Sequence, residues 1–200
     1  IAGLIDPNPN TGNQFGRSTV ILTSGNVVVT SPFDDAGGTD AGAVYLFNGF
    51  TGQLISTLRG SSSGNQVGYG GVTALSNGNY VVISPDWDNG SATDAGAATW
   101  GNGTTGITGN VSSNNSLVGT STNDNIGQVT ALTNGNYVVI SPYWDNGSVT
   151  DAGAVTWGSG TAGVTGVVSA TNSLVGSATN DKVGIGGVAA LSNGNYVVRS

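Results

Sequence analysis

Short apolar runs separated by glycine-rich polar segments recur along the whole chain. The clearest run spans residues 75–85 and contains the string Asn-Gly-Asn-Tyr-Val-Val-Ile-Ser-Pro, which returns within residues 132–142. Another copy occupies residues 191–200, and a diverged copy occupies residues 22–32. Successive copies are 53, 57 and 59 residues apart, measured between the turn glycines Gly25, Gly78, Gly135 and Gly194. This regular spacing indicates a tandem array of one repeat of about 57 residues.

Each repeat begins with a predicted hairpin. In the second repeat the first two strands are Val72 to Leu75 and Tyr80 to Ser84. Between them lies Asn77-Gly78, the residue pair that favours a type I′ turn. Pro85 ends the pairing because it has no N–H to donate. We expect the valines at the centre of each second strand to be buried while their strand neighbours point outward: Val82, Val139 and Val198.

Two more strands complete the predicted repeat. The third follows the sequence Asp-Ala-Gly-Ala, which begins at Asp40, Asp94 and Asp151. The fourth strands are predicted over residues 54–58, 116–118 and 173–175, and in the later repeats an Asn- and Ser-rich insertion precedes them. The chain therefore divides into the end of a preceding repeat (1–13), repeat 1 (14–65), repeat 2 (66–124), repeat 3 (125–181) and the start of repeat 4 (182–200).

The two ends of the chain fall at different points of the repeat. Residues 2–5 match the fourth-strand sequence of residues 52–55, whereas residues 197–200 match a second strand. Joining these ends in a ring would leave a final sheet without its third strand and with exposed edges, which proteins usually cover or pair. We therefore expect the 200 residues to be part of a longer array, or a subunit that neighbouring chains complete in a filament.

Composition supports an all-β protein with a thin core. Glycine accounts for 35 of 200 residues, the hydrophobic content is 37%, and there is no Cys, Met, His or Glu. Gly and Asn suit turns, while Val and Ile suit strands. The architecture predicted is a set of four-stranded, β-propeller-like blades. A β-solenoid is the alternative, and it is less favoured because its rungs usually repeat every 20 to 30 residues.

Charge and residue types restrict the classes of function. The net charge of −7 disfavours nucleic acid and anionic membrane surfaces as partners. No apolar segment is long enough to predict membrane insertion. Without His or Cys the usual Ser/His/Asp and Cys/His catalytic arrangements cannot form, so we do not expect an enzyme. No cofactor motif stands out, because the Gly-x-Gly strings lack a strand-to-helix context.

The first repeat resembles an FG-GAP repeat of the integrin-alpha type. The resemblance rests on Phe15-Gly16, on residues 27–32, and on residues 42–47 followed by Thr-Gly-Gln-Leu. The later repeats resemble a variety found in very large bacterial surface proteins of the filamentous-haemagglutinin kind. The resemblance implies a β-propeller of four-stranded blades and a role in adhesion or assembly at the cell surface. Many FG-GAP repeats carry an Asp-rich calcium loop between their first two strands, where this chain has only residues 76–79, Ser-Asn-Gly-Asn.

A calcium site is a candidate elsewhere in the repeat. Asp86, Asp88 and Asp94 place three carboxylates within nine residues of a glycine-containing loop, and Ca²⁺ prefers several such oxygens. The equivalent loops hold Asp34, Asp35 and Asp40, and then Asp145 and Asp151 with Tyr143 in place of the first acid. The alternative is structural: the middle acid accepts backbone N–H bonds in an Asx-type turn, and the last acid fastens the third strand.

Aromatic residues are predicted to occupy repeated positions in the same regions. Phe33, Trp87 and Trp144 lie in the acidic loops, and Tyr45, Trp100 and Trp157 lie in or after the third strand. Trp87 and Trp144 could stack on the sugar rings of a ligand. The structural alternative, which we favour, is that they cover Gly- and Ala-rich contacts between repeats.

These observations predict a structural or adhesive repeat module of a secreted or cell-surface protein. Its expected partners are copies of itself or neighbouring repeats, with surface glycans or proteins as further candidates. The alternative function is a carbohydrate- or protein-binding propeller that uses the Asp and Trp loops.

Overall fold

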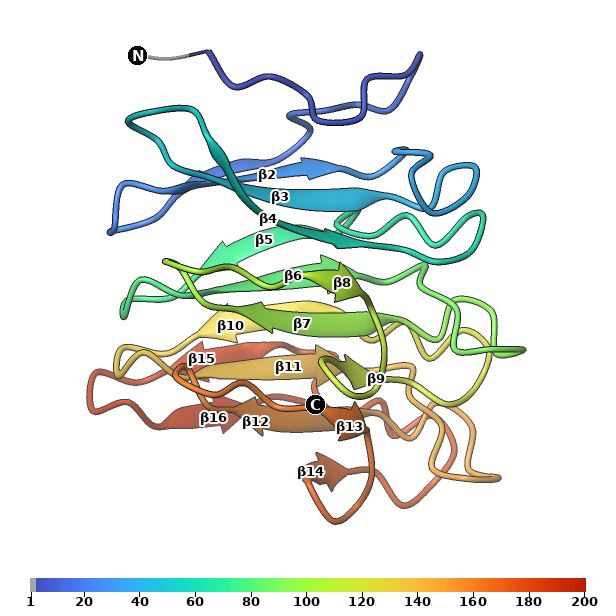
Figure 1. Ribbon diagram of the computed structural model, residues 1–200. Coiled ribbons are helices and arrows are strands. Elements are labelled where there is room, and N and C mark those ends of the chain that lie inside the picture. The colour runs from blue at the N-terminus through green and yellow to red at the C-terminus, as the bar shows by residue number, and fades with distance from the viewer. Residues whose placement is uncertain (1–2) are drawn as a thin grey trace.

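A computed structural model describes residues 3–200, and within them all regular secondary structure is β-strand (Figure 1). Sixteen strands follow one another along the chain: β1 (Thr19–Ile21), β2 (Val27–Ser31), β3 (Ala43–Phe47), β4 (Leu54–Arg59), β5 (Gly71–Ala74), β6 (Tyr80–Ser84), β7 (Ala97–Gly101), β8 (Gly109–Asn110), β9 (Leu117–Val118), β10 (Gln128–Ala131), β11 (Tyr137–Ser141), β12 (Ala154–Gly158), β13 (Gly166–Val167), β14 (Ser173–Val175), β15 (Val188–Ala190) and β16 (Tyr196–Val198).

Each repeat folds into its own antiparallel sheet, which we call a blade. Blade 1 contains β1 to β4, blade 2 contains β5, β6, β7 and β9, blade 3 contains β10, β11, β12 and β14, and blade 4 contains β15 and β16. Strands pair in sequence order within a blade, and the first strands of successive blades lie beside one another. Antiparallel pairing within each repeat is propeller-like, and it differs from a solenoid, in which successive repeats share continuous parallel sheets.

The blades are stacked as layers, with blade 1 at one end and blade 4 at the other (Figure 1). Blades 2 and 3 are therefore covered on both faces. All five residues of β6 and of β11 are buried, so Val82 and Val139 are buried as predicted. The expected outward alternation is wrong for these strands, because Val81 and Val138 are just as buried against the other neighbouring blade. Among the second strands of residues 3–200, alternation appears only in β16, where Val197 is 48% exposed. Val198, predicted to be buried, is only half-buried there.

The hairpin turn differs from the predicted type I′. Only Gly78 has a positive φ, of 88°, and its N–H donates to the carbonyl of Leu75 at 3.0 Å. The N–H of Leu75 in turn donates to the carbonyl of Asn79 at 2.8 Å. This is a three-residue loop, a type I turn closed by a left-handed glycine, and it explains why glycine recurs at this position.

The insertions before the fourth strands have a role that their sequence did not reveal. We define the inserts as residues 102–116 of repeat 2 and residues 159–172 of repeat 3. Each insert reaches back to the preceding blade and adds a short fifth strand to it: β8 pairs in parallel with β4, and β13 pairs in parallel with β9. Every insert therefore ties its own repeat to the one before.

The N-terminal segment does not form the predicted fourth strand. Residues 3–13 contain no strand, and residues 1 and 2 lie outside the described part of the chain. Leu4 packs on the outer face of blade 1 with Phe15, beside buried Tyr45 and Phe47. Asn8 donates a side-chain hydrogen bond to Asp34 at 2.8 Å. This segment covers blade 1 by local contacts rather than by strand pairing.

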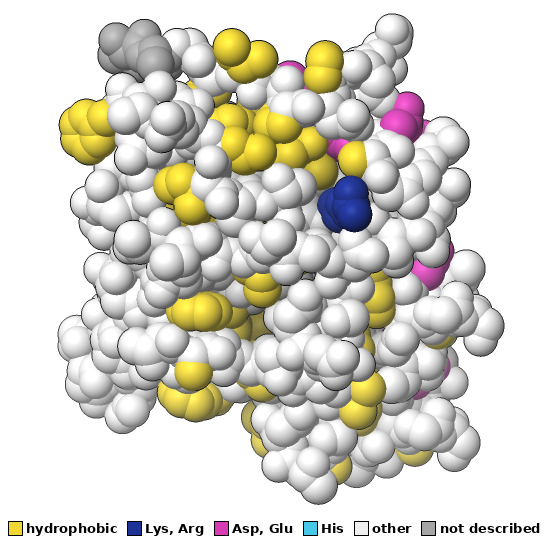
Figure 2. All heavy atoms as spheres, viewed as in Figure 1, with side chains coloured by type: hydrophobic (Ala, Val, Ile, Leu, Met, Phe, Trp, Pro, Cys, Tyr) yellow, Lys and Arg dark blue, Asp and Glu magenta, His cyan; other side chains and the backbone are white. Residues whose placement is uncertain are grey.

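The surface of the stack is mostly neutral and polar. Figure 2 shows uncharged side chains and backbone over most of the visible face, with few charged groups. Among residues 3–200 there is no helix of the length and apolar character that crossing a bilayer requires.

Alkaline pH should destabilise the fold through its buried tyrosines. Burial raises the pKa of Tyr80 and of Tyr137 to about 12. Below pH 10 both rings are neutral in the folded and unfolded chain. Between about pH 10 and pH 12 only the unfolded chain ionises, so the free energy of unfolding should fall by up to about 1.4 kcal/mol per pH unit for each ring. Urea midpoints at pH 8, 10 and 11 measure this fall.

Tyr137→Phe should lower stability at pH 8, because the Tyr137 hydroxyl accepts the N–H of Val164 at 3.2 Å. Above pH 10 the same variant should show a smaller decrease in the free energy of unfolding, because it lacks the ionising group. Phe47→Leu, at a buried ring that does not ionise, is the control and should lower stability without changing the alkaline slope. An equal alkaline slope in all three proteins would contradict the assignment.

Candidate functional site

The junction between successive blades gathers most of the residues that repeat along the chain. Three elements meet there: the acidic loop after each second strand, the start of the following repeat, and the insert. Because the predicted metal-binding and ligand-binding residues lie at this junction, its geometry decides what the repeated residues do.

The acidic loops are held by their own carboxylates. The backbone N–H of Asp94 donates to Oδ1 of Asp88 at 3.0 Å, and that of Asp151 donates to Oδ1 of Asp145 at 2.8 Å. Asp40 and Asp35 make the same contact at 2.9 Å. The middle acid of each loop thus accepts a backbone N–H from the last acid, as the structural alternative predicts.

The Asp-Ala-Gly-Ala sequence is where the next repeat attaches. Asp94 has a φ of 51°, and its carbonyl accepts the N–H of Asn125 at 3.0 Å. The carbonyl of Ala95 accepts the N–H of Ile126 at 3.2 Å. A Cβ on Gly96 would lie 2.2 Å from the nitrogen of Ile126, so only glycine permits this approach. The same contacts recur at residues 40–42 with residues 66–67 and at residues 151–153 with residues 182–183.

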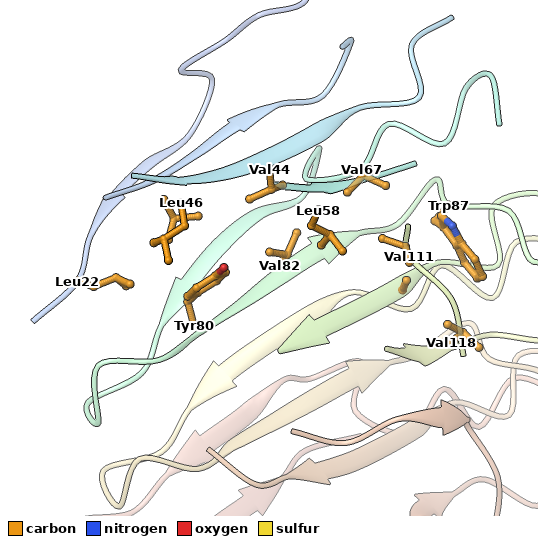
Figure 3. Close-up of a cluster of buried hydrophobic side chains, with 12 residues drawn as sticks. Leu22, Val44, Leu46, Leu58, Val67, Tyr80, Val82, Trp87, Val111 and Val118 are labelled. Carbon is orange, nitrogen blue, oxygen red and sulfur yellow. The ribbon is translucent and has the colours of Figure 1, made fainter. Parts of the chain in front are cut away.

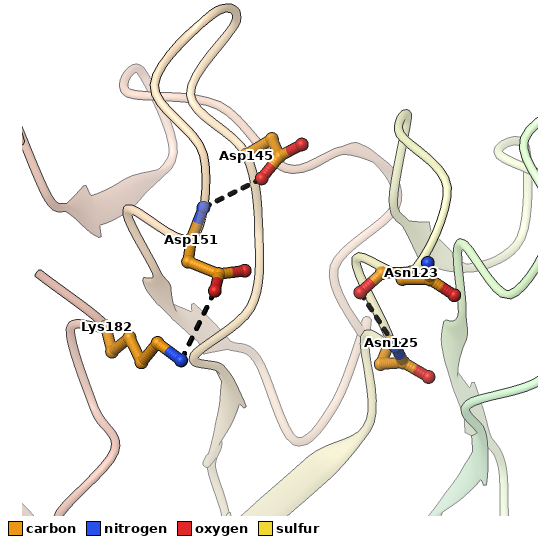
Figure 4. Close-up of polar contacts among 5 residues, drawn as sticks. All are labelled: Asn123, Asn125, Asp145, Asp151 and Lys182. Carbon is orange, nitrogen blue, oxygen red and sulfur yellow. Dashed lines mark hydrogen bonds and ion pairs between the residues drawn. The ribbon is translucent and has the colours of Figure 1, made fainter. Parts of the chain in front are cut away.

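One junction also carries an ion pair. Lys182 Nζ lies 3.2 Å from Oδ2 of Asp151, which joins the acidic loop of repeat 3 to the start of repeat 4 (Figure 4). Both side chains are about one-third exposed, so water screens the pair and its contribution is about 0 to 1 kcal/mol. Gln66 and Asn125 occupy the equivalent positions without charge, so the junction does not depend on an ion pair.

The three acids predicted to bind calcium are near one another but do not form a ligand set. Burial raises the pKa of Asp86, and the charges of Asp94 and Asp88 raise it further. Asp88 uses one oxygen for the N–H of Asp94. Across residues 3–200, no three acidic side chains are grouped so that they could hold a metal ion. The geometry therefore favours a structural role for this loop, and calcium binding stays a prediction to be measured.

Trp87 and Trp144 fill the space between blades. Trp87 is 5% exposed and packs in the cluster shared by blades 1 and 2, beside Val111 of the insert (Figure 3). Trp144 is 3% exposed and packs in the equivalent cluster of blades 2 and 3 with Val168. Buried rings cannot stack on a sugar, so the ligand-binding interpretation of these two residues finds no support, and the structural alternative fits.

The predicted alignment of aromatic positions is wrong by one residue in the first repeat. The carbonyls of Asp34 and Trp87 make equivalent bonds, to the N–H groups of Gly42 and Gly96. Asp34, not Phe33, therefore occupies the place of Trp87. Its buried carboxylate accepts the hydroxyl of Tyr45 at 2.6 Å, and burial and this bond raise the pKa of Tyr45 far above its usual value. Tyr45 itself aligns with Thr99, because Ala43 and Ala97 pair with equivalent serines.

A hydrogen-bonded ladder of asparagine side chains and glycine peptides runs through the junctions. Gly103 donates its N–H to Oδ1 of Asn79 at 2.9 Å, and its carbonyl accepts Nδ2 of Asn26 at 2.8 Å. The next step repeats one blade further along. Gly160 donates to Oδ1 of Asn136 at 3.0 Å and accepts Nδ2 of Asn79 at 2.8 Å. We call this series of contacts the Asn-Gly ladder.

Further donors reinforce the ladder at Gly160. Its carbonyl also accepts Nδ2 of Asn77 at 2.7 Å and the indole N–H of Trp100 at 3.0 Å. A Cβ on Gly160 would lie 1.7 Å from the carbonyl oxygen of Gly135, so glycine is required there. Sequence reasoning missed this role, although Trp-Gly-x-Gly-Thr recurs at residues 100–104 and 157–161, and that recurrence was the available signal.

Comparison with known families agrees with the repeat structure. The family model described as "Repeat of unknown function (DUF5650)" matches residues 74–128, 131–185 and 190–200, which together are more than half of the chain. The model described as "FG-GAP repeat" matches residues 1–47, which confirms the resemblance found in the first repeat. No curated protein matches the chain.

Substitutions at Asp88 should separate an Asx acceptor from a calcium ligand. Asp88→Asn keeps an oxygen for the N–H of Asp94 and should cost little stability, whereas Asp88→Ala should cost about 1 kcal/mol. Thermal melting with millimolar calcium or with chelator should give the same midpoint for the unchanged chain. A midpoint that rises with calcium, and stops rising in Asp88→Asn, would establish the calcium site instead.

Trp87→Ala should destabilise the protein by about 3 to 5 kcal/mol, because it leaves a cavity between blades 1 and 2. Trp157→Ala, at a ring that is 45% exposed, is the control and should cost much less. Urea unfolding measures both. Unchanged stability in Trp87→Ala together with lost binding on a glycan array would favour the ligand-binding function.

Proposed function

The chain belongs to the DUF5650 repeat family, and from this premise we propose that it is a structural module of a secreted or cell-surface protein, built to extend, assemble or adhere. The observation that carries the proposal is that its repeated polar and aromatic residues contact other repeats. Asn79, Asp94 and Trp87 each join neighbouring blades, and their counterparts do the same one repeat away. A catalytic centre would depart from the repeat at one place, whereas a scaffold preserves it.

The surface is compatible with an extracellular setting. The protein has no cysteine to oxidise, a net charge of −7 and a largely neutral polar face (Figure 2). FG-GAP repeats are common in extracellular proteins, and the later repeats resemble those of large bacterial surface proteins. Both resemblances support the proposed location. We propose that neighbouring repeats are the main partners and that the protein has no enzymatic activity.

A carbohydrate- or protein-binding propeller is the other candidate. Burial of Trp87 and Trp144 takes away the aromatic platform that it would use. Exposed aromatic rings do occur, at Phe50, Tyr69, Tyr143 and Trp157. Tyr69 packs on Arg17 and Phe33, and the ring of Tyr143 lies 5.0 Å from the amine of Lys182. The two tryptophans on which the binding function was based are not among these exposed rings.

Protease treatment of intact cells that express the protein tests the proposed location. If the repeats are displayed, peptides from residues 14–181 should be released into the medium without lysis, while a cytosolic marker stays inside. Beads coated with the protein should aggregate or hold to cell surfaces if it adheres. Recovery of the peptides only after lysis would contradict the proposal.

A further inference from the structure

An open pocket lies where β4 of blade 1 meets β8, the strand that the insert of repeat 2 adds to that blade. Its volume is about 280 Å³, and it is lined by Thr57, Arg59, Thr108 and Gly109. The two strands pair in parallel, with Arg59 opposite Asn110 (Figure 1). The pocket is therefore shared by two repeats, and its four lining residues belong neither to the acidic loops nor to the Asn-Gly ladder.

Repeat 1 has no insert of its own to cover this place. A short turn joins its third and fourth strands, and in that turn the N–H of Gly52 donates to the carbonyl of Asn48 at 2.8 Å. Gly106 and Asn102 of repeat 2 make the same bond at 2.8 Å, but there the chain continues as the insert before it enters β9. The fourth strand of repeat 1 thus lacks the cover that the later repeats provide for theirs.

Arg59 occupies the position that Val118 occupies in blade 2. Arg59 pairs with Ala43, and Val118 pairs with Ala97, the alanines that begin the two third strands. Val118 is 0% exposed and belongs to the same apolar cluster as Val111 of its own insert. Arg59 is exposed. A cationic side chain therefore stands in place of a buried apolar one in the repeat that has no insert.

One hydrogen bond orients the guanidinium group of Arg59. Its Nε donates to Oδ1 of Asn110 at 3.1 Å. Among residues 3–200 the two terminal nitrogens of Arg59 meet no acceptor, and no carboxylate lies within ion-pair distance of them. These two nitrogens form a planar pair of donors that matches the two oxygens of a carboxylate. Arg59 is thus held in place with the edge that binds carboxylates still available.

Two hydroxyl groups accompany the guanidinium in the pocket. Thr57 and Thr108 both line it, and neither hydroxyl has a hydrogen-bond partner among residues 3–200. Each hydroxyl can donate one hydrogen bond and accept others. Gly109 leaves space between them and the solvent, because no atom lies within 4 Å of the place that a Cβ would take. The pocket therefore suits a ligand in which a carboxylate is close to hydroxyl groups.

We infer that this pocket binds one carboxylated sugar residue, with its carboxylate on Arg59 and its hydroxyls on Thr57 and Thr108. A pocket of about 280 Å³ is smaller than most sites for drug-sized ligands and fits a single sugar ring. The net charge of −7 opposes ligands with many negative charges, so a single carboxylate is favoured over a phosphate-rich chain. The inference rests on the proposed adhesive function and names a ligand class for it.

Titration of the isotope-labelled chain with glucuronic, galacturonic or N-acetylneuraminic acid, followed by NMR of the backbone amides, tests the inference. With at least one of the three acids, the amide signals of Thr108, Gly109 and Asn110 should shift saturably. The dissociation constant should be about 1 mM, as expected for so small a ligand. Glucose and the uncharged methyl ester of glucuronic acid should leave these signals in place at the same concentrations.

Two results of the titration would overturn the inference. One is the absence of a saturable shift at these amides with all three sugar acids. The other is binding of acetate as tight as that of the sugar acids, because the pocket would then recognise any carboxylate and not a sugar.

Arg59→Gln is the decisive protein variant. Affinity for the sugar acid should fall at least about tenfold, while the thermal midpoint stays close to that of the unchanged chain because the side chain is exposed. Arg59→Lys keeps the charge without the planar pair of donors and should restore only part of the affinity. Arg17→Gln is the control, since it makes the same charge change at a guanidinium that lies over the ring of Tyr69.

The control variant should alter affinity less than about twofold, because a distant surface charge is screened by salt. Equal losses in Arg17→Gln and Arg59→Gln would show that net charge, and not the pocket, decides binding, and the inference would be wrong. Thr108→Val should weaken binding of the sugar acid about two- to tenfold through the lost hydroxyl.

Binding is measured on the purified chain and surface display on intact cells, so the two proposals fail separately. Saturable binding without display would contradict the proposed location and leave the pocket assigned. Display without binding would contradict the pocket and leave the location supported.

Discussion

The stack depends on one recurring contact, a glycine peptide held between asparagine side chains of two blades. Gly103 and Gly160 each donate to an asparagine of their own repeat and accept from an asparagine of the repeat before. An amide side chain can do both at once, since it has an acceptor oxygen and a donor nitrogen. Asn79 does so: it accepts from Gly103 of its own repeat and donates to Gly160 of the next, so a single residue joins two repeats. Aspartate or serine at that position would interrupt the series.

Close approach of backbones at the junctions requires several of the glycines in the chain. At Gly160 a Cβ would lie 1.7 Å from the carbonyl oxygen of Gly135, and at Gly153 it would lie 2.3 Å from the nitrogen of Val183. Neighbouring backbones approach so closely that no side chain fits between them. Trp87 and Trp144 fill the wider space further along the same junction. A thin core of valines is therefore enough, because each internal blade is packed on both faces.

Structural features that depend on one repeat alone were predicted well from the sequence. Features that depend on contacts between two repeats were predicted poorly. Strand positions followed from short apolar runs, and the acidic loop followed from Asp88 and Asp94 as an Asx-type turn. The predicted turn type was wrong because Asn77-Gly78 lies in a three-residue loop, in which only Gly78 has a positive φ. Burial of Val81 and the pairing of β8 with β4 could not be predicted, since both depend on a neighbouring blade. Contacts between repeats leave no periodic signal within one repeat.

Each insert adds a strand to the preceding blade, so a single repeat is an incomplete structural unit. Blade 1 takes its fifth strand from repeat 2, and blade 2 takes its fifth strand from repeat 3. The strand that pairs with Leu58 at the edge of blade 1 is therefore supplied only by the following repeat. Such coupling ties the folding of each repeat to its neighbour more strongly than face-to-face packing alone, because main-chain bonds and apolar burial are gained in the same step. An array built this way gains stability at every added junction, and its geometry is set by backbone contacts that allow only glycine.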